Sequence, residues 1–222
     1  MVSTDSRRLF SDLILFDLDG TLSDPLPGIA RSINYALAAF DYPEHAEPSL
    51  GRFIGPPLDE TFAILTQTKS QGHIKELVDK FRERFKDIGY RENSLYPGVR
   101  AALEDLRTHC RAMAVCTSKR GDFAEKIIKM FKLDHLFDFI SGGDIGISKG
   151  SQIAALMDSG RVDKHALMIG DRDLDLKAGH ANGLATGGVL WGYGSRGELE
   201  KENPAWLFEA PGEWREIFHD RD

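Results

Sequence analysis

Two aspartates, Asp17 and Asp19, follow the apolar run Leu13–Phe16 and precede Gly20. An apolar run of this length, bounded by glycine, is typical of a buried strand in an α/β sheet. Open α/β sheets bind ligands at the carboxyl ends of their strands, where Asp17 would lie. Two acids this close repel each other unless a cation lies between them, and Mg²⁺ binds through one or two carboxylates plus phosphate oxygens. The pattern predicts a magnesium site, and the alternative is a solvated acidic turn.

Two further segments place polar side chains directly after expected strands. Thr117 and Ser118 follow the run Ala112–Cys116, where hydroxyl and backbone N–H groups can hold a phosphate oxygen. They could equally be an ordinary helix cap. Lys149 follows the glycine-rich loop Gly142–Gly146 at the start of a helical pattern. The macrodipole disfavours a lysine there, so the placement favours a lysine that faces an anion, with a surface lysine as the alternative.

A second pair of acids, Asp171 and Asp175, follows the run Leu167–Ile169. Asp171 would lie at the end of that strand and Asp175 one helical turn later, so both can face the same point. Acids in the first turn of a helix are also ordinary partners of its dipole. The order of the whole set, an acid, a hydroxyl, a lysine and then acids, is more specific than any one member.

The elements that would position these side chains alternate between strands and helices. Strand-like runs occur at Leu13–Phe16, Ala112–Cys116, Phe139–Ile140, Ala166–Ile169 and Ala185–Leu190. Helical patterns occur at 100–108, 123–131, 151–157 and 174–181. This alternation predicts an α/β fold with a doubly wound parallel sheet.

The stretch from 23 to 95 contains no convincing strand. Apolar residues recur there with helical spacing over Gly28–Phe40, Leu58–Leu65 and Ile74–Phe85, separated by proline and glycine. We therefore predict a core domain formed by residues 1–22 and 96–222, with a small helical cap domain at 23–95. Both ends of the cap fall near the predicted ligand edge, as expected of a hinged lid.

The composition excludes several classes of function. The chain of 222 residues is 41% hydrophobic and 28% charged, as in soluble globular proteins, and its net charge of −7 disfavours nucleic acid and anionic membranes. Cys110 and Cys116 form no CxxC and are expected to be reduced. Residues 1–8 resemble no signal peptide and no long apolar span occurs, so we expect a cytoplasmic protein.

These motifs resemble those of the haloacid dehalogenase-like phosphohydrolases over nearly the whole chain. The four family motifs correspond to Asp17–Thr21, Thr117–Lys119, Lys149, and Gly170 and Asp171 with Asp175. Three further segments resemble the phosphoglycolate phosphatase and 5′-nucleotidase-like branch, namely 53–58, 95–99 and 192–196.

The resemblance implies a role for each motif residue. Asp17 would attack phosphorus and carry an aspartyl-phosphate, and Asp19 would protonate the leaving oxygen and then activate water. Mg²⁺ would be held by the Asp17 and Asp171 carboxylates and the Asp19 carbonyl, while Thr117 and Lys149 hold the transferring oxygens. Asp175 would orient Lys149 or a metal-bound water.

The substrate is expected to be a small phosphorylated metabolite, 2-phosphoglycolate or a nucleoside 5′-monophosphate. We expect it to contact Thr21, Ser118, Lys119, Arg52 and Gly55. A phosphosugar mutase of the same fold would use the same residues, and a non-catalytic phosphate- or partner-binding module is a further alternative. A dehalogenase is disfavoured because Asp19 would have no role, and a receiver-like domain would be shorter. The sequence leaves open whether the protein is a monomer or a homodimer.

One segment imitates a nucleotide motif. Residues 192–197 fit G-x-G-x-x-G, but a dinucleotide site needs a full βαβ unit, and we expect no strand after this point. We therefore predict a turn. Trp191, Trp206 and Trp214 are expected to be packing residues.

Overall fold

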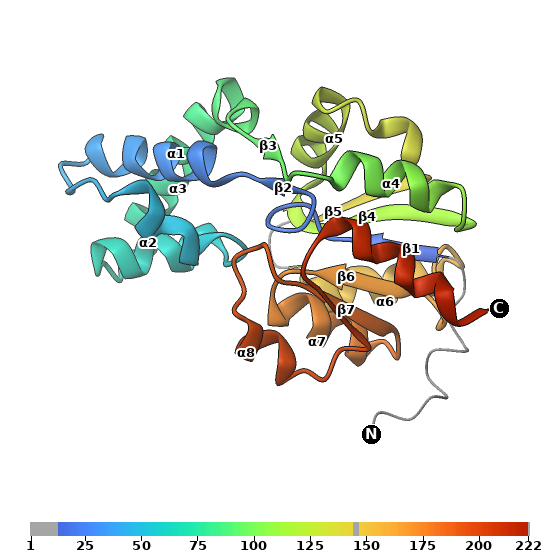
Figure 1. The fold of residues 1–222 in the computed structure, drawn as a ribbon. Coiled ribbons are helices and arrows are strands. Elements are labelled where there is room, and N and C mark those ends of the chain that lie inside the picture. Colours follow the sequence, from blue (N-terminus) through green and yellow to red (C-terminus); the bar gives the residue numbers. More distant parts are fainter. Residues whose placement is uncertain (1–12, 144–146, 222) are drawn as a thin grey trace. The chain divides into compact units, whose positions relative to one another are not determined.

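The computed structural model describes residues 13–143 and 147–221 (Figure 1). Residues 1–12, which belong to the predicted core domain, and 144–146 of the predicted glycine-rich loop lie outside the described residues. The chain divides into two compact units, one running up to Ser23 and resuming at Leu95, the other formed by Asp24–Ser94. We call them the α/β unit and the helical unit. The short strands β2 (Ser23–Asp24) and β3 (Ser94–Leu95) pair where the chain passes between them.

The α/β unit is built on a six-stranded parallel sheet in the order β5-β4-β1-β6-β7-β8. The strands are β1 (Leu13–Phe16), β4 (Ala112–Arg120), β5 (Phe139–Gly143), β6 (Leu167–Gly170), β7 (Ala185–Val189) and β8 (Trp206–Phe208). The chain leaves β1 toward β4 on one side and later returns to β6 on the other. The carboxyl end of β1 is therefore a topological switch point, the place where such sheets bind ligands.

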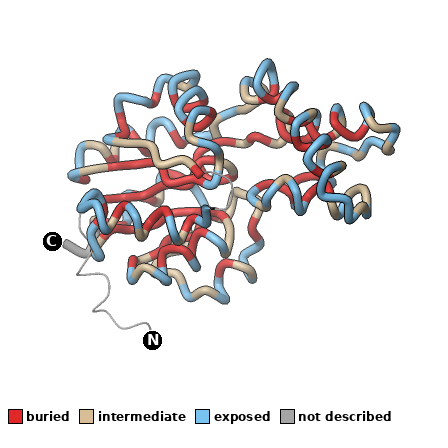
Figure 2. Tube along the Cα trace, turned by 180° about the vertical axis from the view of Figure 1, so that it is seen from behind, coloured by how far each residue is buried: buried red, intermediate tan, exposed pale blue. Residues whose placement is uncertain are grey.

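Helices cover both faces of this sheet, with α4 and α5 on one side and α6 and α7 on the other (Figure 1). The helices are α4 (Val99–Arg107), α5 (Gly121–Met130), α6 (Lys149–Asp158), α7 (Asp173–Ala181) and α8 (Arg196–Glu200), with 3₁₀ segments η4 (Asp134–Leu136) and η5 (Pro211–Arg221). Strands β1, β4, β6 and β7 are buried along most of their length, whereas β5 and β8 are mostly half-buried (Figure 2). Burial on both faces explains why β1 and β6 are continuous apolar runs.

Alternate residues of β1 enter two separate cores. Leu13 and Leu15 pack with Ile153 of α6 and Ala178 of α7. Phe16 points to the opposite face, where its ring lies 5.0 Å from that of Trp214 in η5. Fixing both faces of β1 holds its carboxyl end, and the residues that follow, in place.

Two expectations about the sheet are wrong. The strand expected to end at Cys116 continues to Arg120, because a register shift after Thr117 lets it pair on with Gly143 of β5. A further strand, β8, follows residues 192–197, where we expected none. It is too short, at three residues, to show a period in the sequence.

The helical unit is held together by an aromatic and aliphatic core. Its helices are α1 (Leu26–Ala38), α2 (Leu58–Thr66) and α3 (Gln71–Asp87), with 3₁₀ segments η2 (Glu47–Phe53) and η3 (Gly89–Arg91). Phe81 of α3 stacks on Phe85, with ring centroids 5.3 Å apart, and meets Phe62 of α2 edge-on at 6.5 Å. None of the helices in the described part of the chain is both long and apolar enough to cross a bilayer.

Candidate active site

Asp17 is the first residue after β1 and is held against the neighbouring strand. Its backbone N–H donates to the carbonyl of Ile169 in β6, at 2.9 Å. The chain then turns sharply, with the carbonyl of Leu18 accepting from the N–H groups of Leu22 and Ser23 and with Gly20 at φ +87°. This turn directs the chain out of the sheet while the Asp17 side chain stays at the sheet edge.

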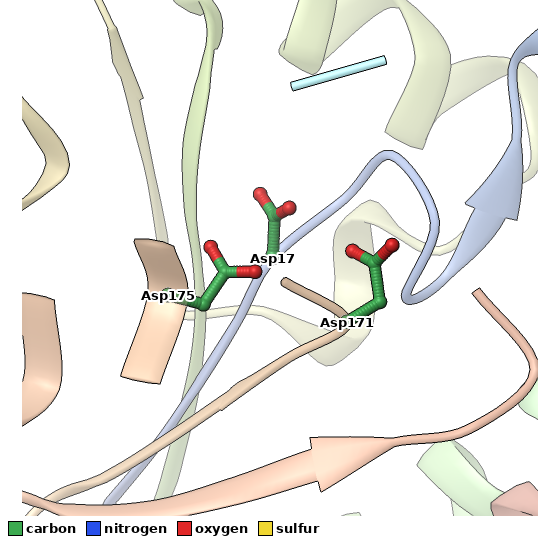
Figure 3. Close-up of side chains that lie close together, drawn as sticks. All are labelled: Asp17, Asp171 and Asp175. Carbon is green, nitrogen blue, oxygen red and sulfur yellow. The ribbon is translucent and has the colours of Figure 1, made fainter. Parts of the chain in front are cut away.

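Asp171 and Asp175 meet Asp17 at this edge. One carboxylate oxygen from each of the three lies within 4.8 Å of those of the other two, and all three residues are buried. Figure 3 shows the three carboxyl groups gathered together, with Asp17 between the other two in this view. Asp171 comes directly after β6, and Asp175 lies in the first turn of α7. Asp17 of the first pair of acids and both members of the second pair thus converge on one point.

Burial makes this cluster electrostatically costly. It raises the pKa of Asp171 well above its ordinary value, and the charges of Asp175 and Asp17 raise it further. Burial is also the main cause that raises the pKa of Asp175 to about 6. A bound cation would offset this repulsion, and buried carboxylate oxygens are the donors that Mg²⁺ prefers. The donor set therefore fits a divalent cation.

Lys149 is the positive charge within the cluster. It is the first residue of α6, whose N-cap Ser148 accepts from the N–H of Ser151. Its Nζ lies 2.8 Å from Asp17 Oδ1 and also pairs with Asp175 Oδ1. Burial alone would lower the pKa of Lys149, but the charges of Asp17 and Asp175 outweigh burial and raise it. Lys149 is therefore charged and can attract a phosphate.

Asp19 forms a second ion pair beside the first. Its Oδ2 lies 2.7 Å from Nζ of Lys119, whose side chain is only 8% exposed. Burial raises the pKa of Asp19, and Asp17 contributes in the same direction, while Lys119 opposes the shift. The other oxygen, Oδ1, is buried and has no hydrogen-bond partner among the described residues. A carboxyl group with a raised pKa and a free oxygen is suited to proton transfer.

Thr117 and Ser118 are consecutive residues of β4. The Thr117 hydroxyl is buried and accepts from the N–H of Lys119 at 3.2 Å, whereas Ser118 is exposed. Gln152 of α6, which sequence reasoning missed, donates from Nε2 to the Thr117 carbonyl at 3.3 Å. A buried glutamine one turn after Lys149 was the available signal. It ties the helix that carries Lys149 to the strand that carries Thr117.

Thr21, expected as a substrate contact, is buried and bonded to an acid. Its hydroxyl donates to Asp171 Oδ1 at 3.3 Å, and its carbonyl accepts from the indole N–H of Trp191 at 3.0 Å. The other Asp171 oxygen accepts from the N–H of Tyr193 at 2.8 Å. Sequence reasoning missed Trp191 and Tyr193 as parts of the site, although the glycines beside them marked a close approach of the backbone.

Arg52 and Gly55 belong to the helical unit. Arg52 lies in η2, with its guanidinium carbon 4.7 Å from the centre of the Phe53 ring. Gly55 has φ +102°, a conformation that favours glycine. The other predicted site residues all lie in the α/β unit.

Comparison with known proteins gives consistent matches. The sequence model of the haloacid dehalogenase-like hydrolase family matches residues 14–189. The chain is 41% identical over 195 residues to a 5′-nucleotidase of Pseudomonas aeruginosa, covering 86% of this chain and 88% of the relative. It is 32% identical over 213 residues to a phosphoglycolate phosphatase of Haemophilus influenzae, covering 89% and 93%.

A further relative has a different activity in its name. The chain is 33% identical over 193 residues to the tyrosine-protein kinase PtkA of Mycobacterium tuberculosis, covering 85% of this chain but only 65% of the kinase. Among solved structures, a predicted phosphatase from Clostridium acetobutylicum superposes with a TM-score of 0.87 at 32% identity, covering 95% of this chain and 99% of that one. On the family match and these relatives, the chain belongs to the haloacid dehalogenase-like hydrolases.

Proposed function

We propose that this chain is a magnesium-dependent phosphatase that hydrolyses a small phosphate monoester through an aspartyl-phosphate on Asp17. Hydrolysis of phosphoric monoesters is the activity that its family and its phosphatase relatives indicate. One observation carries the mechanism: Asp17, Asp171 and Asp175 gather at a topological switch point, and Lys149 contacts Asp17. This arrangement supports a role for Asp17 as the nucleophile, with Asp17 and Asp171 as ligands of the cation and Lys149 as a fixed positive charge.

Each active-site residue of the α/β unit would have a distinct task in the reaction. Asp17 attacks phosphorus, the bond to the ester oxygen breaks, and Lys149 and Thr117 stabilise the charge on the transferring oxygens. Asp19 gives its proton to the departing oxygen and takes one from the water that then hydrolyses the aspartyl-phosphate. Asp175 holds Lys149 against Asp17.

The proposal also includes a magnesium ion in the active site. Asp17, Asp171 and the Asp19 carbonyl would hold it, and when bound it would neutralise phosphate charge so that an anionic nucleophile can approach. The buried acids fit this role because burial, together with the charges of neighbouring acids, raises the pKa of Asp171 and Asp175.

We propose 2-phosphoglycolate or a nucleoside 5′-monophosphate as the substrate. Two relatives whose names indicate these substrates cover most of the chain, which supports the choice. The predictions that five residues contribute to recognition belong to the proposal, namely Thr21, Arg52, Gly55, Ser118 and Lys119. So do the cap role of the helical unit and a cytoplasmic location.

A panel assay tests the proposal. Purified protein is incubated with phosphate monoesters in Mg²⁺, with Asp17→Asn as the matched control, and released phosphate is measured. We expect hydrolysis that EDTA abolishes, that Mg²⁺ restores and that Asp17→Asn lacks. Hydrolysis at the wild-type rate in excess EDTA, or by the Asp17→Asn variant, would refute the metal or the nucleophile respectively.

The match to PtkA favours one second candidate, phosphoryl transfer to tyrosine. The same nucleophile and lysine could pass the phosphoryl group to a phenol instead of water. Incubation with ATP and a tyrosine-containing protein, read with an anti-phosphotyrosine antibody, separates the two. Under our proposal no phosphotyrosine forms, and free phosphate is released only when a phosphate monoester is supplied. A sugar-phosphate isomer exchange without phosphate release would indicate a mutase.

A further inference from the structure

The segment that imitates a nucleotide motif lies against the acid cluster. Residues 191–194, which we call the 191–194 loop, follow β7 and precede α8, whose N-cap is Ser195. The loop belongs to the same unit as Asp171. The proposed reaction gives it no task, although it makes direct contact with one of the proposed metal ligands.

The loop holds one oxygen of the Asp171 carboxylate directly and the other through Thr21. The N–H of Tyr193 donates to Oδ2 directly, at 2.8 Å. Oδ1 accepts from the hydroxyl of Thr21, whose carbonyl in turn accepts from the indole N–H of Trp191. The carboxylate is fully buried, and each of its oxygens accepts a bond that the loop makes or supports.

Two glycines let the loop backbone approach this closely. A Cβ added at Gly192 would overlap both the Asp171 side chain and the carbonyl oxygen of Gly20. A Cβ added at Gly194 would overlap the Asp171 carbonyl oxygen. By contrast, a Cβ at Gly197, in the same motif, would meet no atom within 4 Å. The glycines at 192 and 194 therefore serve packing against Asp171, and the glycine at 197 does not.

A second connection joins the same two segments. Glu198 of α8 accepts from Nε of Arg172 at 2.8 Å and from the N–H of Asp173 at 3.1 Å. Both donors lie just after Asp171. The turn on the far side of Asp171 is thus anchored to the helix that follows the loop.

We propose that the 191–194 loop is a positioning element that holds Asp171 in the geometry needed to bind a divalent cation. This inference rests on the proposed metal site and adds the residues that set its affinity. Hydrogen-bonding partners of a ligating carboxylate typically change metal affinity about 10- to 100-fold when they are altered. The loop would therefore act on metal affinity and not on the chemistry itself.

Calorimetric titration of the metal-free protein with MgCl₂ tests the inference without measuring turnover. Gly192→Ala pushes the loop off Asp171 and Gly20, and Trp191→Phe removes the bond to Thr21 but leaves an aromatic ring at that position. Gly197→Ala is the matched control, with the same chemical change where there is open space. Circular dichroism establishes that each variant is folded. Asp171→Asn reports on the metal site itself.

We expect Gly192→Ala to weaken Mg²⁺ binding about tenfold, Trp191→Phe at least threefold, and Gly197→Ala less than twofold. A folded Gly192→Ala protein whose affinity falls less than threefold would overturn the inference. If Gly192→Ala does not fold, Trp191→Phe decides by the same threefold limit. Wild-type protein that binds no Mg²⁺, or Asp171→Asn that binds it normally, would instead refute the metal site and the inference with it.

Discussion

Charged residues are arranged in opposite ways in the two units. In the helical unit, Glu92 is held by two hydrogen bonds from Arg84, at 2.7 and 3.1 Å, and by a third from Arg31. These arginines, Arg84 first, lower the pKa of Glu92. In the α/β unit, burial and neighbouring acids raise the pKa of Asp171.

These opposite pKa shifts distinguish charged residues that stabilise the fold from charged residues that serve to bind a ligand. Glu92 gains from ionisation in the folded state, whereas ionisation of Asp171 costs folding free energy until a cation arrives. Natural proteins retain such unfavourable clusters at functional sites and lose stability by doing so. The following predictions, in order of decreasing effect, test whether the two regions differ in this way.

Loss of the nucleophile should have the largest effect, which is a loss of activity in a protein that remains folded. Asp17→Asn keeps the volume of the side chain but removes the attacking oxygen, so we expect turnover to fall at least about a thousandfold. Circular dichroism should show the fold unchanged. Turnover within tenfold of the wild type would contradict the role of Asp17.

Loss of the buried lysine should have the largest effect on stability. Lys149→Met leaves Asp17 and Asp175 buried without their counter-charge, which typically costs about 3–5 kcal/mol. Urea unfolding of the metal-free protein measures the loss. Lys177→Met, which removes an exposed lysine paired with Asp173, is the control and should shift the midpoint far less. Equal shifts in the two variants would show that the charge of Lys149 stabilises the fold no more than that of an exposed lysine.

Removal of an acid from the cluster should stabilise the protein, in contrast to removal of the lysine. Asp171→Asn relieves repulsion and still offers an oxygen to the N–H of Tyr193, so we expect the metal-free protein to gain about 1 kcal/mol. Thermal unfolding in EDTA measures this gain. A loss of stability in the variant would mean that repulsion between the buried acids does not destabilise the fold.

Removal of an acid from the helical unit should destabilise it modestly. Glu92→Gln weakens the pairing with Arg84 and Arg31, at an expected cost of about 1 kcal/mol at neutral pH. Because the folded pKa lies below the ordinary value of 4.5, this stability is present above that pH and is lost as pH falls through the folded pKa. Unfolding at pH 7 and pH 3 should therefore show a gap between variant and wild type that closes in acid.

The sequence predicted the acid cluster because strand ends in a parallel sheet meet at one edge. The position of Asp17 after a buried run and of Asp171 after another was enough to infer that they converge, and their oxygens do lie together. The same logic located Lys149 at a helix start. These inferences depend on local pattern and topology, which a single sequence records.

The supporting residues could not be predicted in this way. Thr21 bonds to Asp171, and Gln152 supports Thr117 from a different element, at sequence separations of 150 and 35 residues. Such contacts depend on tertiary packing, which the spacing of apolar residues in the sequence does not reveal. The strand β8 was missed for a related reason, since its three residues form a strand only because β7 lies beside them.

The central claim is that Asp17 carries the phosphoryl group, and trapping that species tests it most directly. The Asp19→Asn variant, which cannot activate water well, is mixed with p-nitrophenyl phosphate and Mg²⁺ and quenched in acid. Mass spectrometry of the peptide that contains residue 17 should then show one added phosphoryl group on Asp17, removable by hydroxylamine. An unmodified Asp17 during turnover, or a phosphoryl group on another residue, would contradict the account.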